Sequence, residues 1–316
     1  MEFTEKALVL KVGRFRENDV WLKLFCAGRG VITAFAFGGS RSRRRFSGCL
    51  DQLVLANFRV ETSRRGAYNV LQEGELLHGF PGLRADTRKI GLVAHCLKFV
   101  EAVQLGQEGA RPVFELLHET LTTLESEAVG AEVLPLLFKA KLTFEQGLKP
   151  DLSLCVRCGR PAWEHGCTGH EPEPAAEYAA EYAVGSGVDS GHAPAADHAA
   201  GHVLARPVRA AQEPAWQEKG DGAFRGYAGP EAGDGQRLGF SVERGGLVCA
   251  LCGDVPAEPL CAGSVRVLEW IGQSRPADWP RLALEPQMRR ELGRVVDRFV
   301  AWHLGLRWEN GTYRKI

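Results

Sequence analysis

Two cysteine pairs with the same spacing stand far apart in this chain, Cys155 with Cys158 and Cys249 with Cys252. Two intervening residues let both thiolates of a turn face one ion, and a glycine after each pair relieves crowding of the backbone amides toward sulfur. Four thiolates form a closed tetrahedral site, the arrangement of structural Zn²⁺. The spacing therefore predicts a fold that brings the two pairs together around a structural zinc ion.

The gap between the pairs is 90 residues, against roughly 15–20 in a compact zinc ribbon. Most of it, residues 161–240, is rich in Ala, Gly, Glu, His and Pro and has no sustained apolar period. Such a segment buries too little apolar surface to offset its ordering entropy, so we expect a disordered insertion. Closing a long flexible loop costs little more than closing a medium one, because the penalty grows logarithmically with length.

Other interpretations of the cysteines stay open. One pair could be a thioredoxin-like redox centre, or the metal could be catalytic with one open position. One of the four ligands could also be exchanged for another nearby side chain: Cys167, His165, His170 or Cys261. The single cysteines in apolar contexts are expected to be buried: Cys26, Cys49 and Cys96.

Residues 1–80 carry five short apolar or β-branched runs separated by several glycine-containing turns. They cover residues 7–12, 20–25, 31–37, 53–61 and 68–76. Five short strands at this spacing predict a small closed barrel, with an SH3-like barrel as the competing assignment.

From about residue 86 the apolar period becomes helical. Ile90, Val93, Leu97 and Val100 follow a 3-4 spacing, and further stripes run over 112–124, 133–144 and 288–302. Gly147 and Pro150 are expected to stop the third of these four helices. We therefore expect a helical domain made of residues 81–160 and 241–316.

Lysine and arginine together equal aspartate and glutamate, at 39 each, so the chain is not a globally basic nucleic-acid binder. A DNA-binding surface must come from local charge segregation, and residues 1–80 have 13 Lys and Arg against 8 Asp and Glu. The N-terminal segment lacks the pattern of a signal peptide, and no apolar run approaches the roughly 20 residues of a membrane span. We expect a cytoplasmic protein without a membrane partner.

A run of arginines follows the third predicted strand: Arg41, Arg43, Arg44 and Arg45. Guanidinium forks match phosphate and stack on bases, and glycines on both sides let the backbone approach a partner. Phe35, Phe37 and Phe46 lie near the run, so a barrel loop that grips single-stranded DNA is favoured over a merely solvated loop. Other basic residues expected to help are Lys11, Arg14 and Lys23.

A second basic face is formed by Arg290, Arg294 and Arg298, which are four residues apart on the last predicted helix. A solvated face is the first interpretation, and a contact with DNA or a partner is the second. Common phosphate-binding, nucleophile-elbow, zinc-protease and dinucleotide motifs are missing from the sequence, so nothing in it indicates an enzyme.

The ordered set of segments resembles the RecO family. The first segments are residues 4–10, 17–19 and 30–33. They are followed by the loop that carries Arg41, Arg43, Arg44 and Arg45 (the arginine loop), and by Phe46-Ser47-Gly48-Cys49-Leu50. They continue with 144–150, with Leu154-Cys155-Val156-Arg157-Cys158-Gly159, and with the glycine pair that precedes the second cysteine pair. The insertion is the one departure, because it is far longer than the connection usual in this family.

The resemblance implies an α+β chain, with a five-stranded OB-fold barrel over residues 1–80 followed by an all-helical domain with an embedded four-cysteine zinc finger. It implies a nucleoid-associated mediator of DNA repair and homologous recombination. Such a protein binds single- and double-stranded DNA, anneals complementary strands and helps to load RecA together with RecR. It also recognises the acidic C-terminal tail of single-strand-binding protein. A zinc-dependent nucleic-acid enzyme and a protein-only zinc-finger adaptor remain as alternatives.

Overall fold

Five strands form the N-terminal part of the computed structural model of this protein. They are β1 (Glu2–Arg14), β2 (Val20–Cys26), β3 (Gly30–Ala36), β4 (Leu55–Thr62) and β5 (Asn69–His78). The structure describes residues 2–42, 44–63, 66, 68–126, 131–162, 224–225, 238–253 and 256–316. Each apolar run of the N-terminal sequence becomes one strand, so the prediction of five short strands is confirmed.

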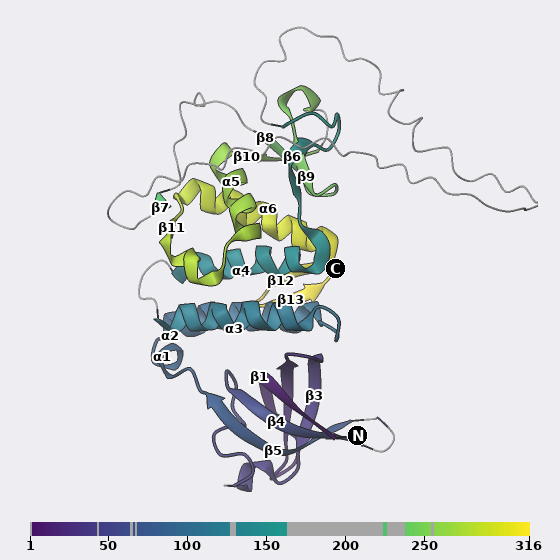
Figure 1. The fold of residues 1–316 in the computed structure, drawn as a ribbon, viewed down its shortest axis with the longest axis vertical. Coiled ribbons are helices and arrows are strands. Elements are labelled where there is room, and N and C mark those ends of the chain that lie inside the picture. Colours follow the sequence, from purple (N-terminus) through teal and green to yellow (C-terminus); the bar gives the residue numbers. More distant parts are fainter. Residues whose placement is uncertain are drawn as a thin grey trace, which may run out of the picture. The chain divides into compact units, whose positions relative to one another are not determined.

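These strands close into a barrel, drawn in purple and blue in Figure 1, and their order around it is β1-β2-β3-β5-β4. β1 pairs with β4 through its first half and with β2 through its second half, and the β1–β2 register shifts between Val9 and Lys11. β3 and β5 join in parallel, with Phe35 opposite Val70. Closing a sheet on itself removes its free edges. The predicted small closed barrel is confirmed.

Apolar side chains fill the barrel. Leu22, Leu24 and Phe58 are completely buried. Cys26 and Cys49 are buried as well, as predicted. Burial, with a smaller contribution from Glu5, raises the pKa of the Cys26 thiol to about 12. Cys26 therefore stays protonated at neutral pH and packs as a small apolar residue.

The α-helices of the described chain all follow the barrel, between Pro81 and Leu304. They are α1 (Pro81–Arg84), α2 (Thr87–Val103), α3 (Ala110–Ser126), α4 (Leu134–Thr143), α5 (Ala262–Gln273) and α6 (Pro286–Leu304). The predicted helices are confirmed as α2, α3, α4 and α6, whereas α5 and the short α1 were not predicted. Single 3-10 turns occupy Gly39–Arg41, Ala131–Val133, Ala250–Cys252 and Pro276–Arg281.

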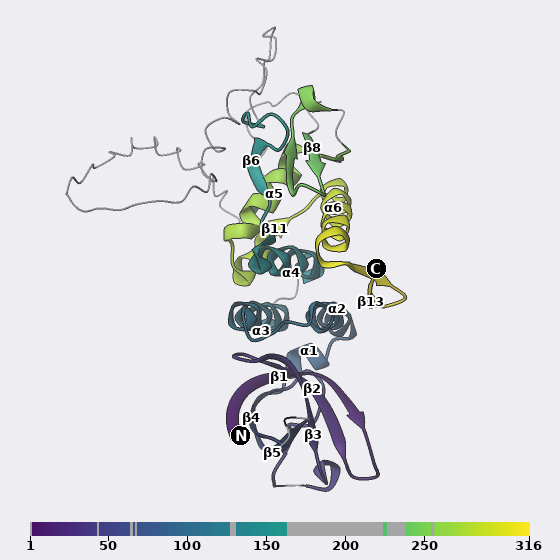
Figure 2. The same ribbon diagram turned by 90° about the vertical axis from the view of Figure 1, so that its right-hand side faces the viewer.

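Helices α2 and α3 lie side by side, and α4 packs against both of them (Figure 2). On α2 the predicted core positions Val93, Leu97 and Val100 are buried, while Ile90 is exposed. One π-helical turn, Phe144–Leu148, extends α4, and Gly147 at a φ of 82° ends it as predicted. None of the described helices has the length and apolar character needed to cross a bilayer.

The prediction of an all-helical second domain is wrong. A four-stranded sheet in the order β10-β8-β9-β6 is built from β6 (Asp151–Cys155), β8 (Leu238–Ser241), β9 (Gly246–Val248) and β10 (Glu258–Leu260). The strands β12 (Leu306–Glu309) and β13 (Thr312–Lys315) form a hairpin, and β7 (Phe224–Arg225) pairs with β11 (Leu282–Ala283). Strands of two to five residues are too short for an alternating pattern to be visible in sequence.

The predicted insertion, residues 161–240, lies largely outside the described residues. At its start, Pro161 forms a β-bridge with Leu154, and at its end Leu238 opens strand β8. Two described stretches, Phe224–Arg225 of β7 and the first residues of β8 from Leu238, therefore form strands inside the predicted insertion. The prediction of disorder concerns residues 163–223 and 226–237, which the structure does not describe.

The barrel and the helices share one apolar core. Phe25 of β2 is fully buried, and its ring lies 5.5 Å from the ring of Phe114 in α3. Beside this contact, Lys23 Nζ lies 2.7 Å from Glu101 Oε1 of α2, and each of these two side chains is 27% exposed. The barrel surface that carries Phe25 and Lys23 is therefore turned toward the helices.

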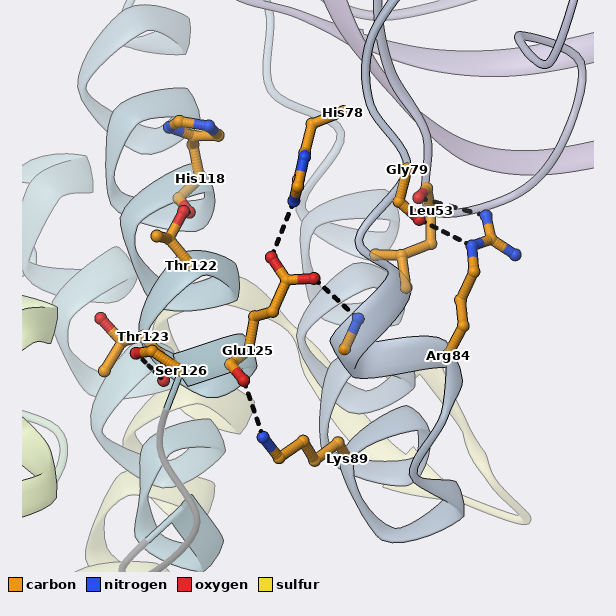
Figure 3. Close-up of polar contacts among 11 residues, drawn as sticks. Leu53, His78, Gly79, Arg84, Lys89, His118, Thr122, Thr123, Glu125 and Ser126 are labelled. Atoms are coloured by element: carbon orange, nitrogen blue, oxygen red, sulfur yellow. Dashed lines mark hydrogen bonds and ion pairs between the residues drawn. The ribbon is translucent and has the colours of Figure 1, made fainter.

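Glu125, near the end of α3, forms polar contacts with the residues that connect the barrel to the helices (Figure 3). Its carboxylate accepts a hydrogen bond from the Gly82 backbone N–H at 2.9 Å and lies 2.7 Å from His78 Nε2. Its backbone carbonyl accepts from Lys89 Nζ at 2.9 Å. Arg84 of α1 donates to backbone carbonyls on the barrel side. These contacts connect the end of β5 with α1, α2 and α3.

Candidate metal centre and nucleic-acid interface

Two short turns bring the cysteine pairs together. Cys155 ends β6, and Cys158 lies in the turn that follows. Cys249 follows β9, and Cys252 ends the 3-10 turn Ala250–Cys252. β6 and β9 are neighbours in the sheet, so the two turns leave it side by side. Gly246 allows this approach, because a Cβ there would lie 2.8 Å from the carbonyl oxygen of Asp151.

The four cysteines form one cluster. Their Sγ atoms all lie within 4.8 Å of one another, and Cys158 Sγ is 3.9 Å from Cys249 Sγ. Tetrahedral thiolate coordination with metal–sulfur bonds of about 2.3 Å separates the sulfurs by about 3.8 Å. All four thiols are free of disulfides. The cluster therefore has the donors and the spacing of a metal site, and the predicted meeting of the two pairs is confirmed.

The surroundings of Cys155 favour its thiolate form. Burial opposes ionisation, but backbone N–H groups of Cys249, Cys158 and Arg157 outweigh it and lower the pKa of Cys155 to about 6. Cys261 lies outside the cluster, at the start of α5, where its Sγ is 3.2 Å from Ser264 Oγ. The other suggested exchange ligands, Cys167, His165 and His170, lie outside the described residues.

The arginine loop is exposed and held by a few local contacts. Gly38, at a φ of 63°, donates its N–H to Asp19 Oδ1 at 2.8 Å and leads into the 3-10 turn Gly39–Arg41. Arg41 and Arg44 are exposed, and Arg41 has a loose ion pair at 3.6 Å with Glu17. Arg43 lies outside the described residues.

Arg45 combines a structural contact with exposure. Its Nη2 donates to the Phe37 carbonyl at 2.7 Å, and its guanidinium lies 5.0 Å from the centre of the Phe46 ring. Phe46 is 4% exposed and belongs to the barrel core, so it is not a stacking surface. Phe37, by contrast, is 39% exposed.

The three further predicted basic residues lie in different environments. Lys11 is exposed on β1 with its Nζ 6.0 Å from the centre of the Trp21 ring, and Arg14 is exposed at the end of β1. Lys23 faces α2 and pairs with Glu101. The structure thus leaves Lys11 and Arg14 accessible and engages Lys23 with the helices.

An exposed aromatic cluster beside the arginine loop consists of Phe15, Phe35, Phe37 and Tyr68. Phe35 lies at its centre, 5.5 Å from Phe15, 6.3 Å from Phe37 and 6.2 Å from Tyr68, measured between ring centres. Phe15 and Tyr68 are about half exposed, at 50% and 47%. The Arg16 guanidinium lies 5.1 Å from the Phe15 ring. Rings of this kind next to cations form a surface on which bases can stack.

Sequence reasoning identified Phe35 and Phe37 but missed Phe15 and Tyr68. Phe15 directly follows β1 and Tyr68 directly precedes β5, and only the closed barrel places them around Phe35. The sequence shows only their positions along the chain: Phe15 lies between the first two predicted runs, and Tyr68 opens the fifth.

The second predicted basic face is partly neutralised. Arg294 Nε lies 3.1 Å from Glu258 Oε2, and Arg298 also pairs with the Glu258 carboxylate. Arg290 is exposed on the same helix. Two of the three guanidiniums thus connect α6 with β10.

Known protein families match both the N-terminal and the C-terminal part of the chain. The family model for the N terminal of recombination protein O matches residues 1–80, and the C terminal model matches residues 84–183 and 228–310. The DNA repair protein RecO of Maridesulfovibrio salexigens is 38% identical over 317 residues, covering 100% of both chains. Those of Nitratidesulfovibrio vulgaris and Oleidesulfovibrio alaskensis are 35% identical over 319 and 316 residues, also covering 100% of both chains. This chain therefore belongs to the RecO family of DNA repair and recombination proteins.

Proposed function

We propose that this protein is a recombination mediator that binds single- and double-stranded DNA, anneals complementary strands and helps to load RecA together with RecR. The observation that carries the proposal is the aromatic cluster beside the arginine loop on a closed barrel. Small barrels bind single strands through a basic groove that follows the backbone and aromatic rings on which bases stack. Neutralising the phosphates of two strands also lowers their mutual repulsion, which annealing requires.

The phosphates would contact Arg41, Arg43, Arg44 and Arg45, with Lys11 and Arg14 on the neighbouring strand. Lys23 is the weakest member of the proposed set, because its ammonium group pairs with Glu101. We assign the barrel to the OB fold. The five strands and the parallel junction of β3 with β5, which closes the barrel between non-consecutive strands, support this assignment.

We propose structural zinc for the four-cysteine cluster. Cysteine-only tetrahedral sites are typical of structural zinc, and four protein thiolates would leave no open coordination position for catalysis. The ion would hold the β6 and β9 turns together and complete the predicted zinc finger. This argument weighs against a zinc-dependent nucleic-acid enzyme.

RecR and the acidic C-terminal tail of single-strand-binding protein are proposed partners, with RecA as an indirect one. These partners, like the cytoplasmic, nucleoid-associated location, rest on family membership. The exposed rings and arginines of the barrel weigh against a protein-only adaptor, because such an adaptor would not bind phosphates or bases through them.

Removal of two arginines tests the barrel interface. In R41A/R44A the affinity for single-stranded DNA should fall. The slope of log affinity against log salt should decrease by about 1.4, since each lost contact with a single-strand phosphate removes about 0.7. Filter binding or fluorescence anisotropy across a salt series measures both quantities. The matched control R88A/R266A removes two exposed arginines of α2 and α5 and should change neither.

Removal of two rings tests stacking separately from charge. In F15A/Y68A the affinity should fall by about 1–3 kcal/mol for each stacked base, whereas the salt slope should stay the same. Unchanged affinity in both the arginine and the ring variants would refute the barrel as the DNA-binding surface.

A further inference from the structure

The C-terminal hairpin β12–β13 presents a charged surface that the proposed function does not use. In its register Trp308 lies opposite Tyr313, and Arg307 lies opposite Arg314. Directly opposed residues of an antiparallel pair share one face, and neighbouring positions alternate between faces. Trp308 and Tyr313 therefore lie on one face of the hairpin, and the two arginines lie on the other.

The aromatic face is fixed to helix α2. The Tyr313 ring lies 4.9 Å from the Phe99 ring, and the Trp308 ring lies 4.4 Å from the His95 ring. Tyr313 Oη is 2.7 Å from His95 Nε2. Burial, reinforced by Lys139, lowers the pKa of His95 to about 4, so a neutral imidazole shares this hydrogen bond with the tyrosine hydroxyl at neutral pH. The hairpin is thereby anchored to α2.

The opposite face holds two guanidinium groups across from each other. Both arginines are exposed, and the Arg307 side chain retains 59% of its accessible surface. Glu309 offers Arg307 only a loose contact of 3.8 Å, and within the described part of the chain Arg314 has no ion pair. Like charges directly opposite each other in a sheet repel, and an anion between them would relieve that repulsion.

The C-terminal segment that contains the hairpin also has an excess of positive charge in its sequence. Residues 286–316 contain seven Lys and Arg against three Asp and Glu, whereas residues 81–285 contain 19 against 28. The chain thus has a basic barrel at one end of its sequence, a basic segment at the other, and an acidic stretch between them. Trp302, four residues before β12, is 60% exposed and adds an aromatic ring to this segment.

We propose that the Arg307–Arg314 face of the hairpin is a second nucleic-acid site, which holds the phosphates of another strand while the barrel holds the first. This inference rests on the proposed function of the barrel. Paired guanidinium forks fit the phosphates of a polynucleotide, and the exposed Trp302 ring of the same C-terminal segment offers a stacking face for its bases. An acidic peptide would use the arginines but not the indole, so a polynucleotide is the better match.

A two-strand capture assay tests the proposal with the full-length protein. An immobilised single strand is loaded with protein, and a labelled strand of non-complementary sequence is then added. R307Q/R314Q should load the first strand like the wild type but capture about tenfold less of the second. The salt slope of that capture should fall by about 1.4, as expected for two lost phosphate contacts. The control R88Q/R266Q removes the same charge elsewhere and should capture normally.

Each result has a defined meaning. Normal capture of the second strand by R307Q/R314Q would overturn the second site. Normal capture together with lost binding of an acidic peptide would overturn it as well, and would show that the two arginines hold a peptide instead. Failure of the wild type to load the first strand would contradict the barrel proposal instead. W302A supports the inference if it weakens the second capture alone, and contradicts the stacking part if capture is unchanged.

Discussion

At the scale of single residues, Cys155 and Cys261 show how environment separates two cysteines of one chain. Cys155 lies among three other thiols, whereas Cys261 caps α5 and accepts a hydrogen bond from the Ser264 N–H. We expect C155S to abolish binding of the proposed zinc ion and to lose about 4 kcal/mol or more of unfolding free energy, as removal of a structural metal does. C261S should keep the metal, because Cys261 lies outside the cluster, and it should keep its stability, because serine also caps helices. Elemental analysis with denaturant unfolding checks both, and a stable, metal-free wild type would contradict the metal assignment.

At the scale of elements, the β2–β3 turn packs against the segment between α2 and α3 through Gly30. Gly30 has a φ of 73°, and a Cβ there would lie 2.1 Å from the Leu105 carbonyl oxygen. Gly66 has a φ of 67°, with no described heavy atom within 4 Å of its Cβ position. G66A should cost only about 1 kcal/mol of backbone strain, and G30A about 2 kcal/mol more because the backbones must separate. Urea unfolding measures the difference, and equal losses would contradict the packing argument.

At the scale of the whole molecule, Phe25 belongs to the core that the barrel shares with the helices, while Phe37 is exposed on the barrel. F25A should lower the unfolding free energy by about 3–5 kcal/mol, and F37A by far less. Because the core is shared, the loss should appear at the same midpoint in tryptophan fluorescence and in far-UV circular dichroism. Two separate transitions in the wild type would show that the barrel and the helices unfold independently.

Much of the fold was predictable where a local pattern repeats. The apolar runs of the barrel and the stripes of α2, α3, α4 and α6 follow the strand and helix periods, which depend only on nearby residues. The strands next to the cysteines were missed because each has five residues or fewer. The prediction that the chain is not an enzyme agrees with its membership of a family of recombination proteins.

The sequence by itself determined which residues could be metal ligands, since two cysteines with two residues between them can face one ion from a single turn. Only the tertiary structure decided what surrounds the other candidates. It turned Lys23 toward Glu101, buried Phe46, and gathered Phe15 and Tyr68 around Phe35. The physical reason is that these neighbours are distant in sequence. Barrel closure, strand register and packing against α2 set their positions, and no local period encodes them.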